Sequence, residues 1–176
     1  MTAQLQTVRM AAGTWAVSDS RTLVTFSVGN LGRRAHGTVG LNWGEVEMDP
    51  DGAPVRVRAE FDLNSLDTGI AKRDADLRKP RFLDVDRYPA MTWSCARFTP
   101  DGEGGWTADG ELSVRGRSAP LTVTGGPEAA ELDGEWVRVR ACGVLDRRSV
   151  GIRAPSFLVG RDVEIAIDAW LTPVRR

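Results

Sequence analysis

The chain has 176 residues, with 23 Lys and Arg against 24 Asp and Glu, one His and two Cys. This balance of charge argues against a dedicated nucleic-acid binder, which would carry a basic excess. The 41% hydrophobic content is typical of a packed globular protein rather than a disordered one. A chain of this length is most simply one domain, and no apolar run is long enough to cross a bilayer.

The N-terminal residues 1–12, MTAQLQTVRMAA, are expected to form a flexible lead-in to a single domain that spans residues 13–173. The lead-in lacks the long apolar segment of a secretory signal peptide. We therefore expect a cytoplasmic protein without a transmembrane segment.

Apolar and polar residues alternate along most of the chain from Trp15 onward. The clearest example is VRVRAEFDL at residues 55–63, where every second side chain is apolar. This period predicts antiparallel strands with one buried and one solvated face. Strands of this kind are predicted at residues 23–28, 38–48, 55–63, 91–96, 106–114, 121–124, 137–142 and 163–171. Residues 125–134 are predicted to form a loop.

One predicted strand changes phase along its length. Val39, Leu41 and Trp43 share the apolar face, whereas the apolar residues beyond Gly44 are one position out of step. A bulge or a sharp bend near the glycine would explain the shift. About eight strands joined by short turns predict an all-β barrel or sandwich.

Residues 63–89, LNSLDTGIAKRDADLRKPRFLDVDRYP, interrupt the alternation once. Apolar and charged residues at spacings of three and four predict a short helix from about Leu66 to Lys79, with Ser65 as its N-cap. Ile70 and Leu77 are expected to face the barrel. An all-β chain that carries one such insert is expected to use it as a cap, gate or site.

The insert resembles the YceI-like family, whose members carry the patterns S-x-x-T-G, R-D-x-H-L and F-D-x-x-x-Y-P. The matching positions here are Ser65, Thr68, Gly69, Arg73, Asp74, Leu77, Phe82, Asp84, Tyr88 and Pro89. Further matches to the family's pattern are Trp15, Asp19, Phe26, Val28, Leu31, Gly32, Gly110, Leu112, Gly116, Pro120, Leu121, Arg147, Gly151 and Ile152. Their order and spacing extend the resemblance over nearly the whole chain.

The resemblance implies an extended, lipocalin-like antiparallel barrel of about eight strands with a helical insert against it. It also implies an apolar tunnel that holds one long-chain amphiphile, such as a polyisoprenoid, an isoprenoid quinone or a fatty amide, without a cofactor or a metal. The tunnel residues expected on this basis are Phe26, Val28, Leu31, Phe61, Leu77, Phe82, Met91, Trp93, Leu112, Val114, Val123 and Ile165.

Three charged residues of the insert, Arg73, Asp74 and Arg78, are expected either to contact the ligand's head group or to hold the cap in place. An arginine suits an anionic head group because its guanidinium donates several hydrogen bonds in a fixed fork. An ion-paired staple between the helix and its neighbouring loops is the alternative interpretation.

Other interpretations stay open. The apolar faces could pack a filled core, in which case the protein would be an interaction module, and an enzyme acting on a hydrophobic substrate could use the same pocket. His36, the single histidine, is expected on the surface, and Cys95 and Cys142 are expected to be reduced, packed thiols. A homodimer is a candidate assembly for a barrel with a mouth to shield.

Overall fold

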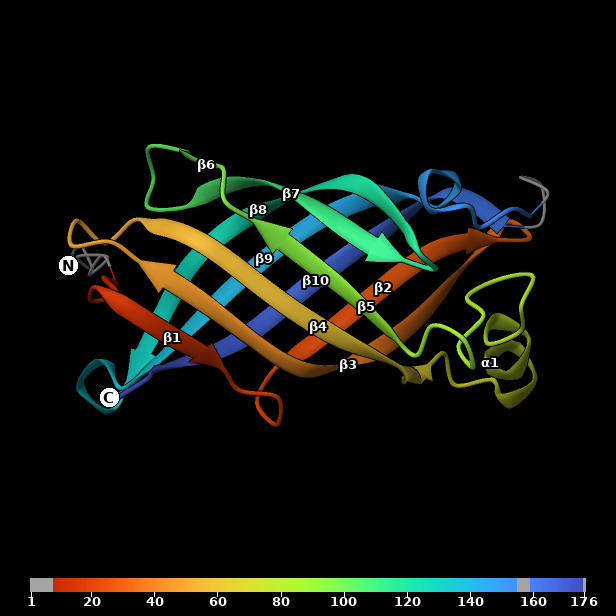
Figure 1. The fold of residues 1–176 in the computed structure, drawn as a ribbon, viewed down its shortest axis with the longest axis horizontal. Coiled ribbons are helices and arrows are strands. Elements are labelled where there is room, and N and C mark those ends of the chain that lie inside the picture. Colours follow the sequence, from red (N-terminus) through yellow and green to blue (C-terminus); the bar gives the residue numbers. More distant parts are fainter. Residues whose placement is uncertain (1–7, 155–158, 176) are drawn as a thin grey trace.

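The computed structural model describes residues 8–154 and 159–175, and its strands form a closed antiparallel barrel (Figure 1). The barrel closes because β10 pairs with β2 on one side and with β9 on the other. In spatial order its strands are β2 (Leu23–Asn30), β3 (Arg33–Met48), β4 (Pro54–Asp67), β5 (Ala90–Cys95), β7 (Trp106–Val114), β8 (Arg117–Glu131), β9 (Trp136–Asp146) and β10 (Val159–Pro173). The predicted lipocalin-like barrel is confirmed.

Two short strands supplement the barrel wall. β1 (Gly13–Val17) pairs with both β10 and β3, and β6 (Phe98–Pro100) pairs with β7. The helical elements are α1 (Ala71–Leu77) and two 3₁₀ turns, η1 (Leu132–Gly134) and η2 (Arg147–Val150).

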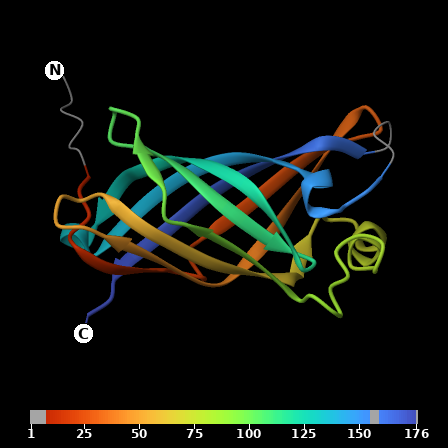
Figure 2. The same ribbon diagram turned by 45° about the horizontal axis from the view of Figure 1, so that its top comes forward.

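The barrel is elongated, and its two ends differ (Figures 1 and 2). One end, which we call the α1 end, carries the strand connections at residues 31–32, 68–89, 115–116 and 147–154. The opposite end, the terminal end, carries the connections at residues 18–22, 49–53, 96–105 and 132–135, and the described chain begins and finishes there.

Side chains fill the interior at the terminal end. Trp15 packs there with Met10, Met48, Val137 and Leu171, and Val137 is fully buried. The Trp15 Nε1 donates a hydrogen bond to the Ala11 carbonyl at 2.9 Å. Nearer the α1 end a second cluster of buried residues surrounds the interior. It comprises Leu63, Leu66, Leu83, Val85, Leu112, Val114, Ala119, Leu121, Val123, Leu145 and Val150.

The expected flexible lead-in is wrong for part of its length. Residues 1–7 lie outside the described part of the chain, but Met10 is buried against Trp15. The alternation of apolar and polar residues predicts strands. It gives no information on a short irregular segment, such as the one around Met10, that covers an end of the barrel.

The phase shift in β3 is real but occurs earlier than predicted. The β3–β4 register slips between Thr38 and Gly40 and again between Leu41 and Trp43. Trp43 therefore lies on the outside with 44% of its surface exposed, where the alternation placed it inside. A bulge turns every following side chain to the other face, so its position decides which residues are buried.

The predicted loop at residues 125–134 is instead mostly strand, because β8 continues to Glu131. A Cβ atom at Gly125 would lie 2.0 Å from the Arg140 carbonyl oxygen. Glycine at this position therefore permits a close approach of β8 to β9 rather than marking a turn. The register of the two strands slips between Pro127 and Ala129, where a proline can be tolerated.

The helix of the insert is shorter than predicted. β4 continues to Asp67, and α1 begins only at Ala71. Ser65 is not an N-cap: its hydroxyl accepts a hydrogen bond from the Gly40 amide at 2.6 Å and donates one to the Asp62 carbonyl at 2.5 Å. Gly69, with a φ of 77°, turns the chain between strand and helix.

Candidate functional site

The candidate site is a cavity of roughly 590 Å³ inside the barrel, at its α1 end. Apolar side chains of all eight barrel strands and of the insert form most of its wall. Eleven of the residues predicted for the tunnel line it: Phe26, Val28, Phe61, Leu77, Phe82, Met91, Trp93, Leu112, Val114, Val123 and Ile165. Nine of them lie on strands, where alternation predicts inward-facing positions because these recur with period two. Leu77 and Phe82 belong to the insert and do not follow from alternation.

The twelfth predicted tunnel residue, Leu31, is misplaced. It stands at the tip of the β2–β3 turn with a φ of 49°, and 67% of its surface is exposed. The neighbouring Asn30 lines the cavity instead. The turn breaks the alternation of β2, so the pattern of that strand does not extend to Leu31.

Inside the cavity the wall is apolar, and the polar groups gather at its mouth. The Trp93 indole, within the barrel, donates its hydrogen bond to the Leu121 carbonyl at 3.1 Å. The polar and charged lining comes from the ends of β2 and η2 and from the insert. These lining residues are Asn30, Thr68, Lys72, Arg73, Asp76, Lys79, Arg81 and Arg147.

The first turn of α1 is tied to the end of β4 by a buried carboxylate. Asp74 accepts hydrogen bonds from the Thr68 amide at 3.0 Å and from the Thr68 hydroxyl at 2.5 Å. Arg73 donates from Nε to the same hydroxyl at 2.8 Å and from Nη2 to the Thr68 carbonyl at 3.0 Å. Both residues thus hold the cap in place, and Arg73 also lines the cavity.

Two further arginines bind the insert to the barrel. Arg78 donates to the Asn64 and Leu66 carbonyls at 3.0 and 2.9 Å. Arg115 donates to the Pro80 carbonyl at 3.0 Å and to the Gly151 carbonyl at 3.3 Å, which links the insert to the β9–β10 connection. Of the three charged residues predicted for the cap, Asp74 and Arg78 lie outside the cavity lining.

Arg147 is a buried cation beside the mouth, and sequence reasoning gave it no role beyond a family match. Its guanidinium donates to the carbonyls of Gly160, Ile152, Ala154 and Val159 at 2.8 to 2.9 Å. Among the described residues no carboxylate lies within ion-pair distance of it. The carbonyl dipoles solvate the charge without neutralising it, so this wall of the mouth has a positive potential.

Two aspartates at this end are held ionised by neighbouring bases. A hydrogen bond from Lys79, at 2.6 Å, lowers the pKa of Asp76. Hydrogen bonds from the Arg148 side chain and amide, assisted by Arg161, lower the pKa of Asp146. Of these two carboxylates only Asp76 belongs to the cavity lining, where it stands against Lys72, Arg73, Lys79, Arg81 and Arg147, so cations dominate the mouth.

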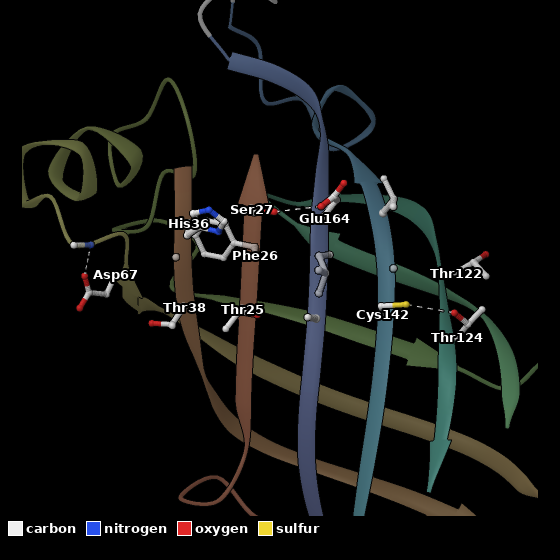
Figure 3. A pocket seen from close by; sticks show the side chains of 16 residues that line it. Thr25, Phe26, Ser27, His36, Thr38, Asp67, Thr122, Thr124, Cys142 and Glu164 are labelled. Carbon is white, nitrogen blue, oxygen red and sulfur yellow. Dashed lines mark hydrogen bonds between the residues drawn. The ribbon is translucent and has the colours of Figure 1, made fainter. Parts of the chain in front are cut away.

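A second, more open hollow lies on the outer face of the barrel over β3, β2, β10, β9 and β8 (Figure 3). Polar and small side chains line most of it, among them Thr25, His36, Glu164 and Thr124. The predicted surface position of His36 is confirmed. A hollow of this composition gives a long alkyl chain much less apolar contact than the inner cavity does.

The two cysteines are free thiols in different environments. Cys95 is buried and donates to the Arg97 carbonyl at 3.2 Å, and burial raises the pKa of its thiol. Cys142 lies exposed in the outer hollow beside Thr124, so the expectation of a packed thiol is wrong for this residue (Figure 3). A raised pKa disfavours the thiolate that a nucleophilic Cys95 would need.

Within residues 8–154 and 159–175, no group of three or more His, Cys, Asp or Glu side chains is placed to hold a metal ion. None of the helices in that part of the chain has the length and apolar character required to cross a bilayer.

Comparison with known families finds a match to the model of the YceI-like domain over residues 15–171. UPF0312 proteins of Yersinia enterocolitica and Vibrio cholerae are 34% identical over 68 residues and 30% identical over 81 residues. These matches cover 39% and 46% of this chain but only 35% and 43% of the relatives' own lengths.

Solved structures share the fold at low sequence identity. Burkholderia cenocepacia BcnA aligns with a TM-score of 0.77 at 17% identity, over 88% of this chain and 98% of BcnA. A polyisoprenoid binding domain from Saccharophagus degradans aligns with a TM-score of 0.67 at 10% identity, over 91% and 98%. A Campylobacter jejuni YceI protein aligns with a TM-score of 0.67 at 14% identity, over 99% and 92%.

Proposed function

The chain belongs to the YceI-like family, and from that premise we propose that it binds one long-chain amphiphile in its inner cavity, to sequester or transport it. The ligand classes that fit are a polyisoprenoid, an isoprenoid quinone and a fatty amide. The first of these agrees with one structural neighbour, which is described as a polyisoprenoid binding domain.

The observation that carries the proposal is a cavity in the one half of the barrel where side chains do not fill the interior. Its volume of roughly 590 Å³ is typical of small-molecule sites, and its wall is apolar. Burial of an alkyl or isoprenoid tail gains about 0.8 kcal/mol per methylene before the cost of ordering it. Burial of the tail of a long-chain amphiphile therefore suffices to retain the ligand in the cavity.

The charges at the mouth favour a head group that is anionic or an acceptor of hydrogen bonds. Lys72 and Arg81 line the mouth, and within the described residues neither has an acidic side chain at ion-pair distance. Arg147 adds its buried charge. Arg73, Asp74 and Arg78 act chiefly by fixing the insert over the ligand, with Arg73 also within reach of the head group.

The two rival functions receive less support. An enzyme would need convergent polar groups around a reacting atom, whereas the inner wall is apolar and its polar residues lie at the mouth. The matching family is named only as a YceI-like domain, and the Saccharophagus degradans neighbour is named for binding. Neither name refers to a reaction. An interaction module with a filled barrel does not account for the cavity.

The test is native mass spectrometry of the purified protein, followed by extraction into organic solvent and identification of the lipid. We expect a stoichiometric adduct that solvent releases. The bare protein should also take up an offered polyprenyl phosphate, quinone or fatty amide. A mass that stays unchanged with all three probes would contradict the proposal.

A further inference from the structure

The two ends of the barrel carry opposite charge. Between the strands, the α1 end has ten Lys and Arg against four Asp: six against four in the β4–β5 insert, Arg115 in the β7–β8 turn, and Arg147, Arg148 and Arg153 after β9. The connections of the terminal end have two Arg against seven Asp and Glu, and the ends of the described part of the chain add Arg9 and Arg175. A net charge of −1 conceals this separation.

Exposed aliphatic side chains accompany the cations at the α1 end. Leu31, at the tip of the β2–β3 turn, is 67% exposed, and Ile70, at the start of α1, is 51% exposed. Arg33 stands two residues after Leu31 and is itself exposed. Since Asn30 and Ile70 both line the cavity, these side chains surround the mouth through which a ligand would pass.

We propose that the α1 end docks on the surface of an anionic phospholipid bilayer. Leu31 and Ile70 enter the head-group region, while Arg33, Lys72 and Arg81 contact lipid phosphates. Basic residues near an anionic surface and apolar residues at the interface contribute independently to such binding. The charge separation orients the barrel, with its mouth toward the lipid and its acidic end away.

An acidic protein or a nucleic acid would satisfy the cations but not the rest of this surface. Exposed leucine and isoleucine gain little from a phosphate backbone, and single-stranded nucleic acids are bound through aromatic stacking. The apolar cavity opens between these side chains. If this opening faces a bilayer, a lipid can move between the bilayer and the cavity without crossing water. The docking surface extends the proposed function by naming where the ligand is exchanged.

The experiment is flotation of the full chain with vesicles of phosphatidylcholine that contain phosphatidylglycerol, and with vesicles of phosphatidylcholine alone, over a series of salt concentrations. We expect binding to the anionic vesicles that weakens as salt rises. Arg33→Glu should weaken binding about tenfold or more. Each basic residue near an anionic membrane surface contributes to the binding free energy, and this substitution replaces an attractive charge by a repulsive one. Leu31→Ser should weaken it about fivefold.

Matched substitutions at the terminal end serve as controls. Leu132 is 68% exposed, close to the value for Leu31, and has a similar positive φ of 52°, but it lies among Glu131, Asp133 and Glu135. Leu132→Ser and Arg97→Glu should leave vesicle binding unchanged. Equal losses in the test and control variants, or binding that does not depend on phosphatidylglycerol, would overturn the proposal. So would tighter binding of an oligonucleotide that Leu31→Ser leaves unaltered.

Neither Leu31 nor Arg33 lines the cavity, so the two proposals can fail separately. A lipid adduct in Arg33→Glu together with lost vesicle binding supports both. An adduct without any vesicle binding by the original chain overturns the docking surface alone. Vesicle binding without an adduct or uptake overturns the carrier function and leaves the docking surface standing.

Discussion

The same strands build both halves of the barrel, but the two halves serve different purposes. At the terminal end, Trp15, Met10 and Val137 fill the interior, and the connections outside are acidic. At the α1 end, the same inward alternation leaves a cavity of roughly 590 Å³ under a basic insert. A barrel of this size can therefore obtain stability from one half and reserve the other for a ligand.

The largest expected effect comes from truncation of the filled half. Trp15→Ala should cost about 3–5 kcal/mol of unfolding free energy, because it creates a cavity and removes the indole hydrogen bond to Ala11. Met91→Ala, in the cavity wall, should cost less, since Met91 is only partly buried and already borders empty space. Urea denaturation of both variants measures the difference, and equal losses would contradict the division into a filled and an open half.

Filling the cavity should separate binding from stability. Leu112→Trp or Val123→Trp should abolish lipid uptake in native mass spectrometry, at a cost of about 1–3 kcal/mol from local strain. The control is Ala169→Trp in the filled half, where the packed cluster has no room for the indole ring. This substitution should lower the free energy of unfolding more than either cavity substitution does. Uptake that survives both cavity substitutions would show that the tail binds elsewhere.

The buried carboxylate of the insert tests whether the cap closes the cavity. Asp74→Ala leaves the Thr68 amide without its acceptor, at a cost of about 1–3 kcal/mol. Hydrogen exchange at residues 68–77 should quicken, and ligand release should be faster, while the terminal half keeps its protection. Exposed Asp86, also in the insert, provides the control substitution Asp86→Ala, which should change neither rate.

The smallest expected effect is on how the stability of the protein depends on pH. Because Arg148 and Arg161 lower the pKa of Asp146, its ion pairs stabilise the folded state at pH values above the ordinary value of 3.8. This contribution is lost as the pH falls below that value toward the lowered one. Thermal melting of Asp146→Asn should show a lower Tm than the original chain at neutral pH, with the difference shrinking in acid. A difference that persists unchanged at low pH would assign the effect to packing.

Much of the fold was accessible from period two alone. The alternation of β4 and the limits of β7 follow from the sequence, and nine inward strand positions of the cavity wall follow with them. The errors fall where a local event changes which face a side chain takes. Trp43 follows a bulge, and Leu31 stands in a turn, so their burial depends on strand register rather than on residue type.

The sequence by itself determined an antiparallel barrel with inward apolar faces and one charged insert, because side-chain period and turn residues act locally. Tertiary structure alone decided that Trp15 and Met10 close one end, that four carbonyls surround Arg147, and that ten basic residues from separate connections gather at the other end. Barrel closure brings together connections that are distant along the chain. No pattern in a single strand shows which of them will share an end, or whether the space between them is filled.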